Sequence, residues 1–576
     1  MKLSVLGHAR RRRLVAPLVG VLALAVVIGT GLDAGHRRAE ATAVPAASSA
    51  QPAARPNIVV VMADDMRTDD LRFMPSVRHL LVARGLTFRN SFSPYPLCCP
   101  ARASFLTGEY AHNHRVFSHM APWGFRAFDD HATLATALHS SGYRTAFVGK
   151  YLNGYGAQRS LVTGRPSFRY VPAGWTDWYG AVQRPGGSPY KSGGTYNYMH
   201  TIFNVNGRID DSHDGEYQTD VLGRFSRSLV TRYSRSDRPF FMWFSAVAPH
   251  FGGPREKDDP NHVRGPGGTT VRIPTPARPR WVRGRFDRQI PRASGLPVDG
   301  GPSEADISDK PRPMRNLREL TRDERLAVRE STRQRAEALY VLDQQVSRLV
   351  QTLRATGELD RTVIAFTSDN GYFLGEHRRV QGKINPQEPS LRVPLVLAGP
   401  GIPHGQRYDP ATTPGLTATV AELAGATGAM PYDADGISLV RSIDADRGWT
   451  VPVVTEGRED SKAFSDNPML RAPGFHDPRN TIGVRTGRWK FVEYSNGDSE
   501  LYDLDADPNE LQNLTADPSY AAIRTELHQV WLDYKDCRGA PCRADLPDDL
   551  RLTPAQEAAG TDRQSRGVQA RYGYWR

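Results

Sequence analysis

The chain has 576 residues, of which 39% are hydrophobic and 24% are charged, and its formal net charge is +12. This composition is typical of a globular protein of two or more domains and excludes an intrinsically disordered chain. Residues 1–43 contribute +5 of this net charge, so the remaining residues are still basic. We expect these residues to bind a polyanionic glycan and no nucleic acid. A positive charge that serves only solubility explains the composition equally well.

Residues 1–43 are predicted to be an export signal. Four arginines at 10–13 precede an apolar segment over 14–32, and small residues at Ala39, Ala41 and Ala43 offer cleavage sites. The alternative is an uncleaved membrane anchor, because the apolar segment is almost long enough to span a bilayer. We therefore expect a secreted protein, bound to a membrane only if this segment stays uncleaved. Residues 44–56 are predicted to be a flexible linker.

Four apolar runs after the linker are predicted to be strands buried on both faces of a parallel sheet. They cover residues 56–62, 143–148, 239–247 and 362–367. Helical patterns separate them, over residues 74–84, 133–141 and 337–355. This alternation predicts an α/β domain with a doubly wound, mostly parallel sheet over residues 57–440.

Polar residues follow each of the four predicted strands. The first strand leads into Asp64 and Asp65, the second into Lys150, the third into His250, and the fourth into Asp369 and Asn370. The carboxyl ends of parallel strands line one crevice, so we expect these side chains to lie together. The carboxylates and the amide offer only oxygen ligands, which Ca²⁺ or Mg²⁺ prefers. Taken singly, each Asp is more often a helix cap or a turn former than a metal ligand.

The segment Cys98-Cys99-Pro100-Ala101-Arg102 begins a predicted helix. Pro100 suits the first helical turn, where its missing N–H costs nothing. Cys98 therefore lies at a helix N-terminus, where backbone N–H groups favour an anion, and Arg102 adds donors that match a tetrahedral oxyanion. The alternative is a strained Cys98–Cys99 disulfide or two small buried side chains.

The rest of the chain divides into three parts. Residues 251–318 are rich in Pro, Gly and Arg and are predicted to be a long insertion over the domain. Residues 441–545 contain alternating strand patterns around the turn at 495–498, which predicts a small antiparallel α+β subdomain. Cys537 and Cys542 flank a turn-forming stretch that a disulfide could close, in agreement with an oxidising compartment. Residues 546–576 are predicted to be a polar tail.

The Cys98–Arg102 segment resembles the signature of the type I sulfatases, with Ala101 where serine is usual. Residues 369–377, closing in Gly382-Lys383, resemble the second signature of that family, and Lys150 and His250 stand where the family has its lysine and histidine. The sequence around Lys150, residues 303–311 and residues 500–510 are similar to the branch of N-acetylglucosamine-6-sulfatases and their arylsulfatase relatives. Many sulfatases have a histidine at the position of Leu152, and the resemblance implies that Asn153 takes over its contact with the aldehyde hydrate or sulfate.

The resemblance implies an alkaline-phosphatase-like fold and a set of roles. Cys98 would be oxidised to formylglycine by the formylglycine-generating enzyme, and the hydrated aldehyde would attack sulfur. The metal ligands would be Asp64, Asp65, Cys98, Asp369 and Asn370, and the catalytic residues Cys98, Arg102, Lys150, His250 and Lys383. The resemblance leaves open whether His112, His114 or His377 contacts the substrate.

The function implied is a sulfuric ester hydrolase acting on a sulfated glycan or an aryl sulfate, with arginines of the insertion (Arg278, Arg280, Arg283 and Arg285) binding the sugar. One alternative is a phosphonate or phosphodiester hydrolase, because related folds share the cysteine signature. Another is a non-catalytic polyanion-binding protein that uses the basic insertion.

Overall fold

The computed structural model describes residues 55–184, 193–265, 269–458 and 478–574. The predicted export signal and nearly all of the predicted linker lie outside these residues. No helix in the described ranges has both the length and the apolar character that a bilayer-spanning segment requires.

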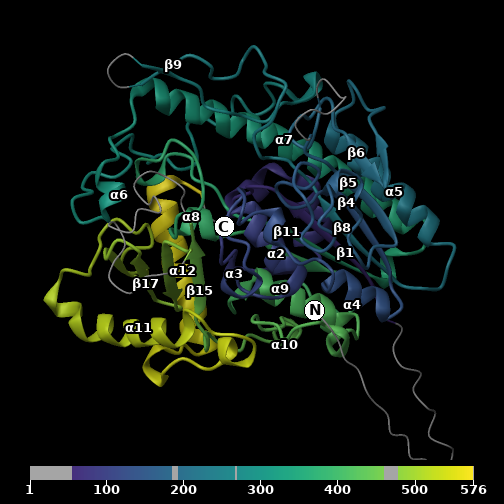
Figure 1. Cartoon of the computed structure of the whole chain (residues 1–576). Coiled ribbons are helices and arrows are strands. Elements are labelled where there is room, and N and C mark those ends of the chain that lie inside the picture. The colour runs from purple at the N-terminus through teal and green to yellow at the C-terminus, as the bar shows by residue number, and fades with distance from the viewer. Residues whose placement is uncertain (1–54, 185–192, 266–268, 459–477, 575–576) are drawn as a thin grey trace, which may run out of the picture. The chain divides into compact units, whose positions relative to one another are not determined.

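The four predicted strands are neighbours in the middle of a ten-stranded sheet (Figure 1). Strand β1 (Asn57–Ala63) pairs in parallel with β8 (Phe240–Ser245) on one side and with β11 (Thr362–Ser368) on the other. Strand β4 (Arg144–Lys150) pairs in parallel with β8. Because these strands are central, both of their faces are covered, which explains their continuous apolar sequences.

Shorter strands extend the sheet on both sides, in the order β13-β2-β12-β11-β1-β8-β4-β5-β6-β7. They are β2 (Leu86–Phe88), β5 (Asp177–Ala181), β6 (Phe203–Val205), β7 (Arg208–Asp210), β12 (Leu395–Ala398) and β13 (Gly405–Arg407). Strand β5 continues the parallel arrangement, whereas β6, β7 and β12 are antiparallel to their neighbours. The predicted fold class is confirmed, with antiparallel edges on a parallel centre.

Helices cover the two faces of this sheet. Val59 and Val61 pack into one core with α5 (Gln218–Tyr233) and α7 (Arg322–Ala355). Ile58 and Val60 point the other way, into a second core with α2, α4 and α9. These three helices are Cys98–Thr107, Leu134–Ser140 and Thr413–Leu423. The alternating side chains of β1 therefore bury both layers of helices, as in a doubly wound sheet.

Two predicted helices differ in length from the observed ones. The helix predicted over 337–355 begins fifteen residues earlier, at Arg322, where Thr321 and Glu324 form a capping box. The helix predicted over 74–84 is a short helix α1 (Pro75–Val77) followed by a π-helical turn, η2 (Arg78–Val82). Asp343 of α7 accepts hydrogen bonds from the backbone N–H groups of Ser76 and Val77, which fixes the start of α1 against α7.

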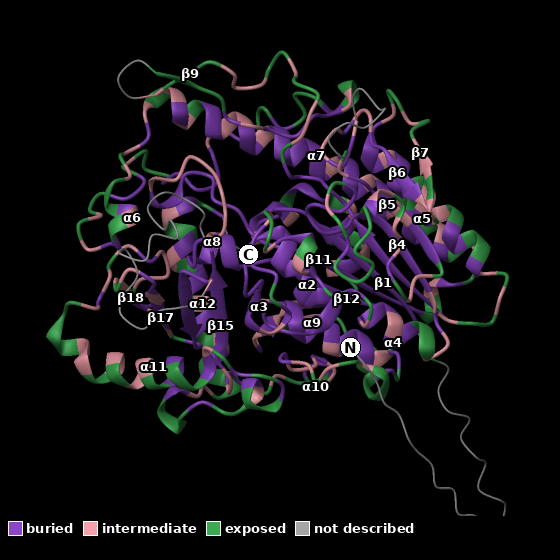
Figure 2. Cartoon of the chain, in the orientation of Figure 1, coloured by how far each residue is buried: buried purple, intermediate pink, exposed green. Residues whose placement is uncertain are grey.

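A small antiparallel sheet forms the C-terminal part, with strands β15 (Val453–Gly457), β16 (Thr481–Arg485), β17 (Trp489–Tyr494) and β18 (Ser499–Asp503). Helix α11 (Ala521–Tyr534) packs on it with one face and exposes the other (Figure 2). The sequence pattern over 480–494 contains two strands, β16 and β17, joined at residues 486–488. The Cys537–Cys542 disulfide is present.

The prediction of a polar tail after residue 545 is wrong, because residues 554–572 form helix α12 (Pro554–Tyr572). Thr553 and Gln556 cap its start. Its buried stripe consists mainly of small and polar residues, namely Glu557, Gly560, Thr561, Gln564, Ser565, Val568 and Tyr572. A stripe of this composition has the spacing of a packed helix without the hydrophobicity that marks one in a sequence.

The insertion after His250 packs along α7, and one expectation for it is wrong. Arg278, proposed above to bind a sugar, is only 2% exposed and forms ion pairs with Glu256, Asp258 and Glu337 at 2.6–2.8 Å. A buried guanidinium with three acidic partners has no free donors for a substrate. Arg280, Arg283 and Arg285 are exposed.

The remaining short elements connect these parts. They are β3 (Ser91–Phe92), α3 (Ala111–His114), β9 (Val263–Arg264), β10 (Thr270–Val271), α6 (Arg312–Arg315), α8 (Glu388–Leu391), β14 (Ala411–Thr412) and α10 (Arg441–Asp444).

Candidate active site

The carboxyl ends of β1, β4, β8 and β11 bring the predicted polar residues together. Ala63 of β1 lies opposite Ser368 of β11, so Asp64 and Asp65 leave the sheet beside Asp369. The backbone N–H of Asp65 donates to Oδ1 of Asp369 at 3.1 Å. Asp65 has φ of +67°, a left-handed conformation that Asp tolerates better than most residues and that turns its side chain out of the strand direction.

Cys98 is the first residue of α2 and lies among these groups. Its Sγ is 3.2 Å from Oδ1 of Asp64 and 2.8 Å from Nζ of Lys383. Burial and the charge of Asp64 raise the pKa of the Cys98 thiol well above its usual value. The unmodified side chain is therefore a neutral thiol, which is a poor nucleophile.

Arg102 lies one turn further along α2 and is fully buried. Its Nε donates to Oδ2 of Asp369 at 2.8 Å, and its Nη1 donates to the Lys150 carbonyl at 2.7 Å. Its Nη2 has no hydrogen-bond partner among the described residues. Arg102 thus fixes the position of Asp369 through Nε, and its Nη2 lies 3.8 Å from Oδ2 of Asp64.

Two lysines balance the carboxylates. Nζ of Lys150 is 2.5 Å from Oδ2 of Asp64, and Lys383 forms an ion pair with Asp65. Burial alone would raise the pKa of Asp64, but Lys150 and the other nearby cations hold it well below its usual range. Burial and the charge of Asp64 raise the pKa of Asp369 to about 6. Each of the three carboxylates thus has one cation as its partner, Lys150, Lys383 or Arg102.

The donor set fits a hard divalent cation. Oδ2 of Asp65 and Oδ1 of Asn370 are buried and have no hydrogen-bond partner among the described residues. One potential ligand atom from each of Asp64, Asp65, Cys98 and His250 lies within 4.8 Å of the others. Unpaired buried oxygens are costly unless they bind a cation or water, so these residues can hold Ca²⁺ or Mg²⁺.

His250 follows β8 and is 4% exposed. Its Nδ1 is 2.7 Å from the Phe251 carbonyl, which requires that Nδ1 carries a proton and donates it. Nε2 lies 3.7 Å from Oδ2 of Asp65. Burial lowers the pKa of His250 to about 4, so the ring is neutral at pH 7 and its Nε2 is an acceptor.

Tyr196, which the sequence analysis did not identify, completes one wall of the crevice. Its ring centroid is 4.8 Å from that of His250, and Nζ of Lys150 is 5.1 Å from the ring centroid. Asn153, named above as a possible sulfate contact, donates from Nδ2 to the Tyr196 hydroxyl at 2.6 Å. Tyr196 belongs to an irregular segment before β6, so no strand end marks it in the sequence.

His119 was also missed. Its buried Nε2 has no hydrogen-bond partner among the described residues. Burial and the nearby charges of Lys383 and Lys150 lower the pKa of His119 well below its usual value. His119 is therefore a neutral ring within range of the charges of the crevice.

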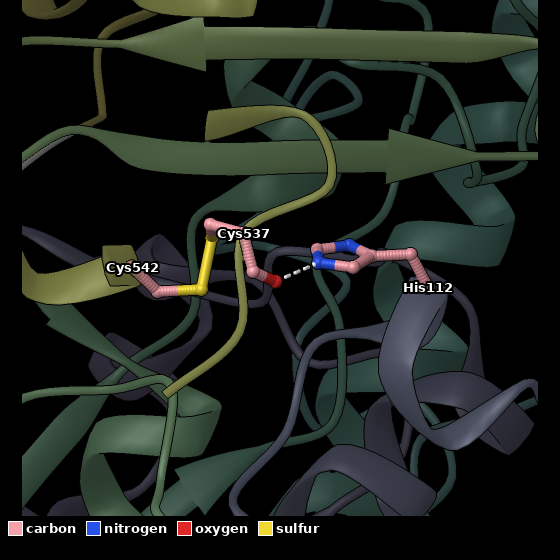
Figure 3. A group of neighbouring side chains, drawn as sticks. All are labelled: His112, Cys537 and Cys542. Carbon is pink, nitrogen blue, oxygen red and sulfur yellow. Dashed lines mark hydrogen bonds between the residues drawn. A yellow bond between two sulfur atoms is a disulfide. The ribbon is translucent and has the colours of Figure 1, made fainter. Parts of the chain in front are cut away.

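The three histidines left open above do not join the crevice. Figure 3 shows His112 beside the Cys537–Cys542 disulfide, where its Nε2 lies 2.6 Å from the Cys537 carbonyl and its Nδ1 lies 2.9 Å from Glu456. Both sulfurs are bonded to each other, so this group is no metal site. His114 contacts Ser104 at 3.0 Å, and His377 contacts Glu304 at 2.9 Å.

The profile of the family described as Sulfatase matches residues 56–426, which is more than half of the chain and includes every residue of the crevice described above. The chain belongs to the sulfatase family. A second profile, described as N-sulphoglucosamine sulphohydrolase, C-terminal, matches residues 375–536 and covers the small antiparallel sheet. The protein is a sulfuric ester hydrolase.

Curated relatives of this sulfatase cover most of its length. An arylsulfatase of Volvox carteri is 29% identical over 516 residues, 85% of this chain and 76% of the relative. An N-acetylglucosamine-6-sulfatase of Homo sapiens is 27% identical over 526 residues, 85% of this chain and 86% of the relative.

Solved structures confirm the fold. A protein solved in complex with its substrate D-glucosamine-2-N,6-O-disulfate has a TM-score of 0.59 and 20% identity, over 85% of this chain and 98% of the other. A phosphonate monoester hydrolase of Silicibacter pomeroyi has a TM-score of 0.57 and 18% identity, over 86% of this chain and 99% of the other. At these identities the likeness concerns the fold alone, so the second match gives no support to the phosphonate alternative.

Proposed function

We propose that this sulfatase removes sulfate from sugar sulfates of the glucosamine 6-sulfate type and from aryl sulfates, with formylglycine formed from Cys98 as nucleophile and Ca²⁺ as the metal. The observation that carries the proposal is the convergence on Cys98 of Asp64, Asp65 and Lys383 at hydrogen-bond or ion-pair distance. The names of the curated relatives support the two substrate types.

The metal would be held by the side chains of Asp64, Asp65, Asp369 and Asn370, together with the modified side chain at 98. Carboxylate and amide oxygens without a soft ligand favour Ca²⁺ or Mg²⁺ over zinc. Bound there, the cation would offset the negative charge of the sulfate oxygens.

An anionic sulfate ester can bind in the crevice only if nearby cations offset the negative charge of the carboxylates. Lys150 and Lys383 place their ammonium groups beside Asp64 and Asp65, on the side where the sulfate oxygens would lie. Arg102 fixes Asp369 and adds a positive charge beside Asp64. Fixed charges of this kind stabilise the transition state without reorganisation. The hydrated aldehyde would supply one hydroxyl for attack on sulfur and a second whose collapse releases sulfate.

We also infer export of the protein and oxidation of Cys98 by a formylglycine-generating enzyme. The Cys537–Cys542 disulfide supports an oxidising compartment, and the basic and apolar pattern of residues 1–43 supports a cleaved signal. N-terminal sequencing of the secreted protein is expected to begin at Thr42 or Val44. Recovery of the intact N-terminus in a membrane fraction would support the anchor instead.

The substrate proposal is tested by sulfate release from N-acetylglucosamine 6-sulfate and 4-nitrophenyl sulfate, with a phosphonate monoester as the competing substrate. Both sulfates should be hydrolysed at least tenfold more efficiently, in kcat/KM, than the phosphonate, and the Cys98→Ala protein should hydrolyse none. Preference for the phosphonate, or no sulfate release by protein whose aldehyde has been verified, would refute the proposal.

A further inference from the structure

Tyr196 is held in the crevice by its backbone. Its carbonyl accepts a hydrogen bond from the N–H of Gly253 at 2.8 Å, and the N–H of Tyr198 donates to the Gly253 carbonyl at 2.8 Å. Residues 196–198 therefore pair, strand-like, with the segment that follows His250. This pairing fixes the Tyr196 ring relative to His250, and Nζ of Lys150 lies over the Tyr196 ring.

The Tyr196 hydroxyl accepts a hydrogen bond and has a proton to give. Nδ2 of Asn153 donates to it at 2.6 Å, and Nζ of Lys150 lies 5.1 Å from the ring centroid. No described residue accepts the hydroxyl proton. A phenol can accept and donate at the same time, so the Asn153 donor occupies an acceptor site and orients the O–H bond away from Asn153.

The other groups of the crevice are less suited to donate to the oxygen that leaves with the alcohol. The neutral ring of His250 donates its proton at Nδ1 to the Phe251 carbonyl. The ammonium groups of Lys150 and Lys383 are directed at Asp64 and Asp65. At position 152, where many sulfatases have a histidine, this chain has Leu152, which is buried in the core.

We propose that Tyr196 is a catalytic residue that donates a hydrogen bond to the leaving-group oxygen of the sulfate ester. This inference rests on the proposed function of the crevice. As the S–O bond breaks, negative charge develops on that oxygen, and a preorganised donor stabilises it more in the transition state than in the bound ester. Burial raises the pKa of Tyr196 to about 12, despite the opposing charge of Lys150, so the hydroxyl stays protonated at neutral pH.

The role predicts a dependence on the leaving group. A 4-nitrophenolate ion is a stable leaving group without a hydrogen-bond donor, whereas the alkoxide of a sugar needs a donor to stabilise its negative charge. The Tyr196→Phe protein keeps the ring that packs against His250 and Lys150 and loses only the hydroxyl. Its kcat should fall by less than about threefold on 4-nitrophenyl sulfate and by about 100-fold on N-acetylglucosamine 6-sulfate.

A series of substituted phenyl sulfates measures this dependence directly. Plots of log(kcat/KM) against leaving-group pKa should be steeper for Tyr196→Phe than for the wild type. Tyr198→Phe is the matched control, because the buried Tyr198 hydroxyl donates to the His250 carbonyl at 2.7 Å and does not face the substrate. We expect Tyr198→Phe to lower kcat/KM by the same factor for every ester, without changing the slope of log(kcat/KM) against leaving-group pKa.

The outcomes separate this inference from the proposed function. An equal loss on all esters by Tyr196→Phe, with an unchanged slope, would make Tyr196 a packing residue and overturn the inference alone. A wild-type protein that carries the aldehyde at 98 and hydrolyses no sulfate ester would overturn the proposed function, and this inference with it. The aldehyde content of each variant is measured by peptide mass, so that incomplete modification does not imitate a loss of rate.

Discussion

At the scale of single residues, the two adjacent cysteines differ in their surroundings. Cys98 contacts Asp64 and Lys383, whereas Sγ of Cys99 lies 3.7 Å from the Asn153 carbonyl and packs in the apolar core. Burial raises the pKa of Cys99 to about 12, which leaves it an inert thiol.

The first prediction follows from this difference. The peptide carrying both cysteines should contain an aldehyde at 98 and an unmodified thiol at 99. Cys98→Ala should abolish turnover, and Cys99→Ala should keep most of it, since it removes only a small buried group. Mass spectrometry of the native protein checks the first point and steady-state kinetics the second. A quantitative Cys98–Cys99 disulfide in active protein would contradict both.

The second prediction concerns the metal. Chelation should remove activity and lower Tm, and Ca²⁺ or Mg²⁺ should restore both, because a ligand that binds only the folded state stabilises it. Asp369→Ala should lose the activity and the metal-dependent rise in Tm. Asp360→Ala, an exposed residue just before β11, is the control and should retain both. If Asp369→Ala binds the metal as tightly as the wild type does, the proposed ligand set is wrong.

The residues that sequence analysis found and those it missed differ in one respect. Asp64, Asp65, Lys150, His250 and Asp369 each follow a strand whose apolar sequence is easy to recognise, so their convergence follows from the sheet. Tyr196 and His119 come from irregular segments, where no periodic pattern fixes position. Their approach to Lys150 depends on tertiary contacts such as the pairing of residues 196–198 with Gly253.

At the scale of elements, Glu456 of β15 joins the small sheet to the α/β domain. It accepts hydrogen bonds from the backbone N–H groups of Ala111 and His112 and forms ion pairs with His112 and Arg479, while only 2% exposed. Burial would raise the pKa of Glu456, but His112 and Arg479 lower it to about 2.

The third prediction is the pH dependence of this junction. A carboxyl whose pKa is lower in the folded protein stabilises it fully above its unfolded pKa, about 4.5, and the stabilisation is lost as pH falls toward 2. The shift corresponds to about 3 kcal/mol. Glu456→Gln should therefore lower Tm by several degrees at pH 7 and by clearly less at pH 3.

Calorimetry of both proteins at the two pH values checks this prediction. Glu493→Gln is the control, because the half-exposed Glu493–His528 pair lies on the same small sheet and surface pairs contribute little. A difference in Tm between wild type and Glu456→Gln that does not change between pH 7 and pH 3 would show that charge does not stabilise the junction.

The fourth prediction concerns the insertion. Arg278→Met leaves Glu337 buried without its cation and leaves Glu256 with Arg283 alone, which should destabilise the fold by about 3–5 kcal/mol. Arg280→Met, at an exposed position two residues away, should change stability by less than about 0.5 kcal/mol. Denaturant unfolding of the two variants is the measurement. Similar stabilities for both would mean that the ion pairs of Arg278 do not hold the insertion to α7.

Elements were predictable where hydrophobic periodicity defines them. The central strands were found to within about two residues, and the turn at 495–498 does separate β17 from β18. Helix α12 was not found, because Gly560, Thr561 and Ser565 form much of its buried stripe. The extra length of α7 was missed for a related reason, since its first four turns are rich in Arg and Glu and bury only part of their surface.

At the scale of the whole molecule, the crevice depends on contacts between distant parts of the chain. Asp64 and Cys98 meet Asp369 and Lys383 through the pairing of β1 with β11. The C-terminal end contributes as well, because the Tyr574 hydroxyl donates to Glu376 at 2.9 Å, within the second signature. The order of strands was inferable only in part, since parallel neighbours such as β1 and β8 are linked by long crossovers that leave the order open.

The complete burial of Cys98 limits the time during which an enzyme can oxidise its thiol. Its solvent-accessible surface is 0% of that of an exposed residue, so an enzyme that oxidises this thiol must reach it before the sheet closes over it. The strand that closes the crevice, β11, is synthesised about 260 residues after α2. At about 5–20 residues per second this leaves roughly 13–50 s during synthesis. Faster translation, or a shortage of the oxidising enzyme, would then yield protein that is correctly folded and permanently inactive.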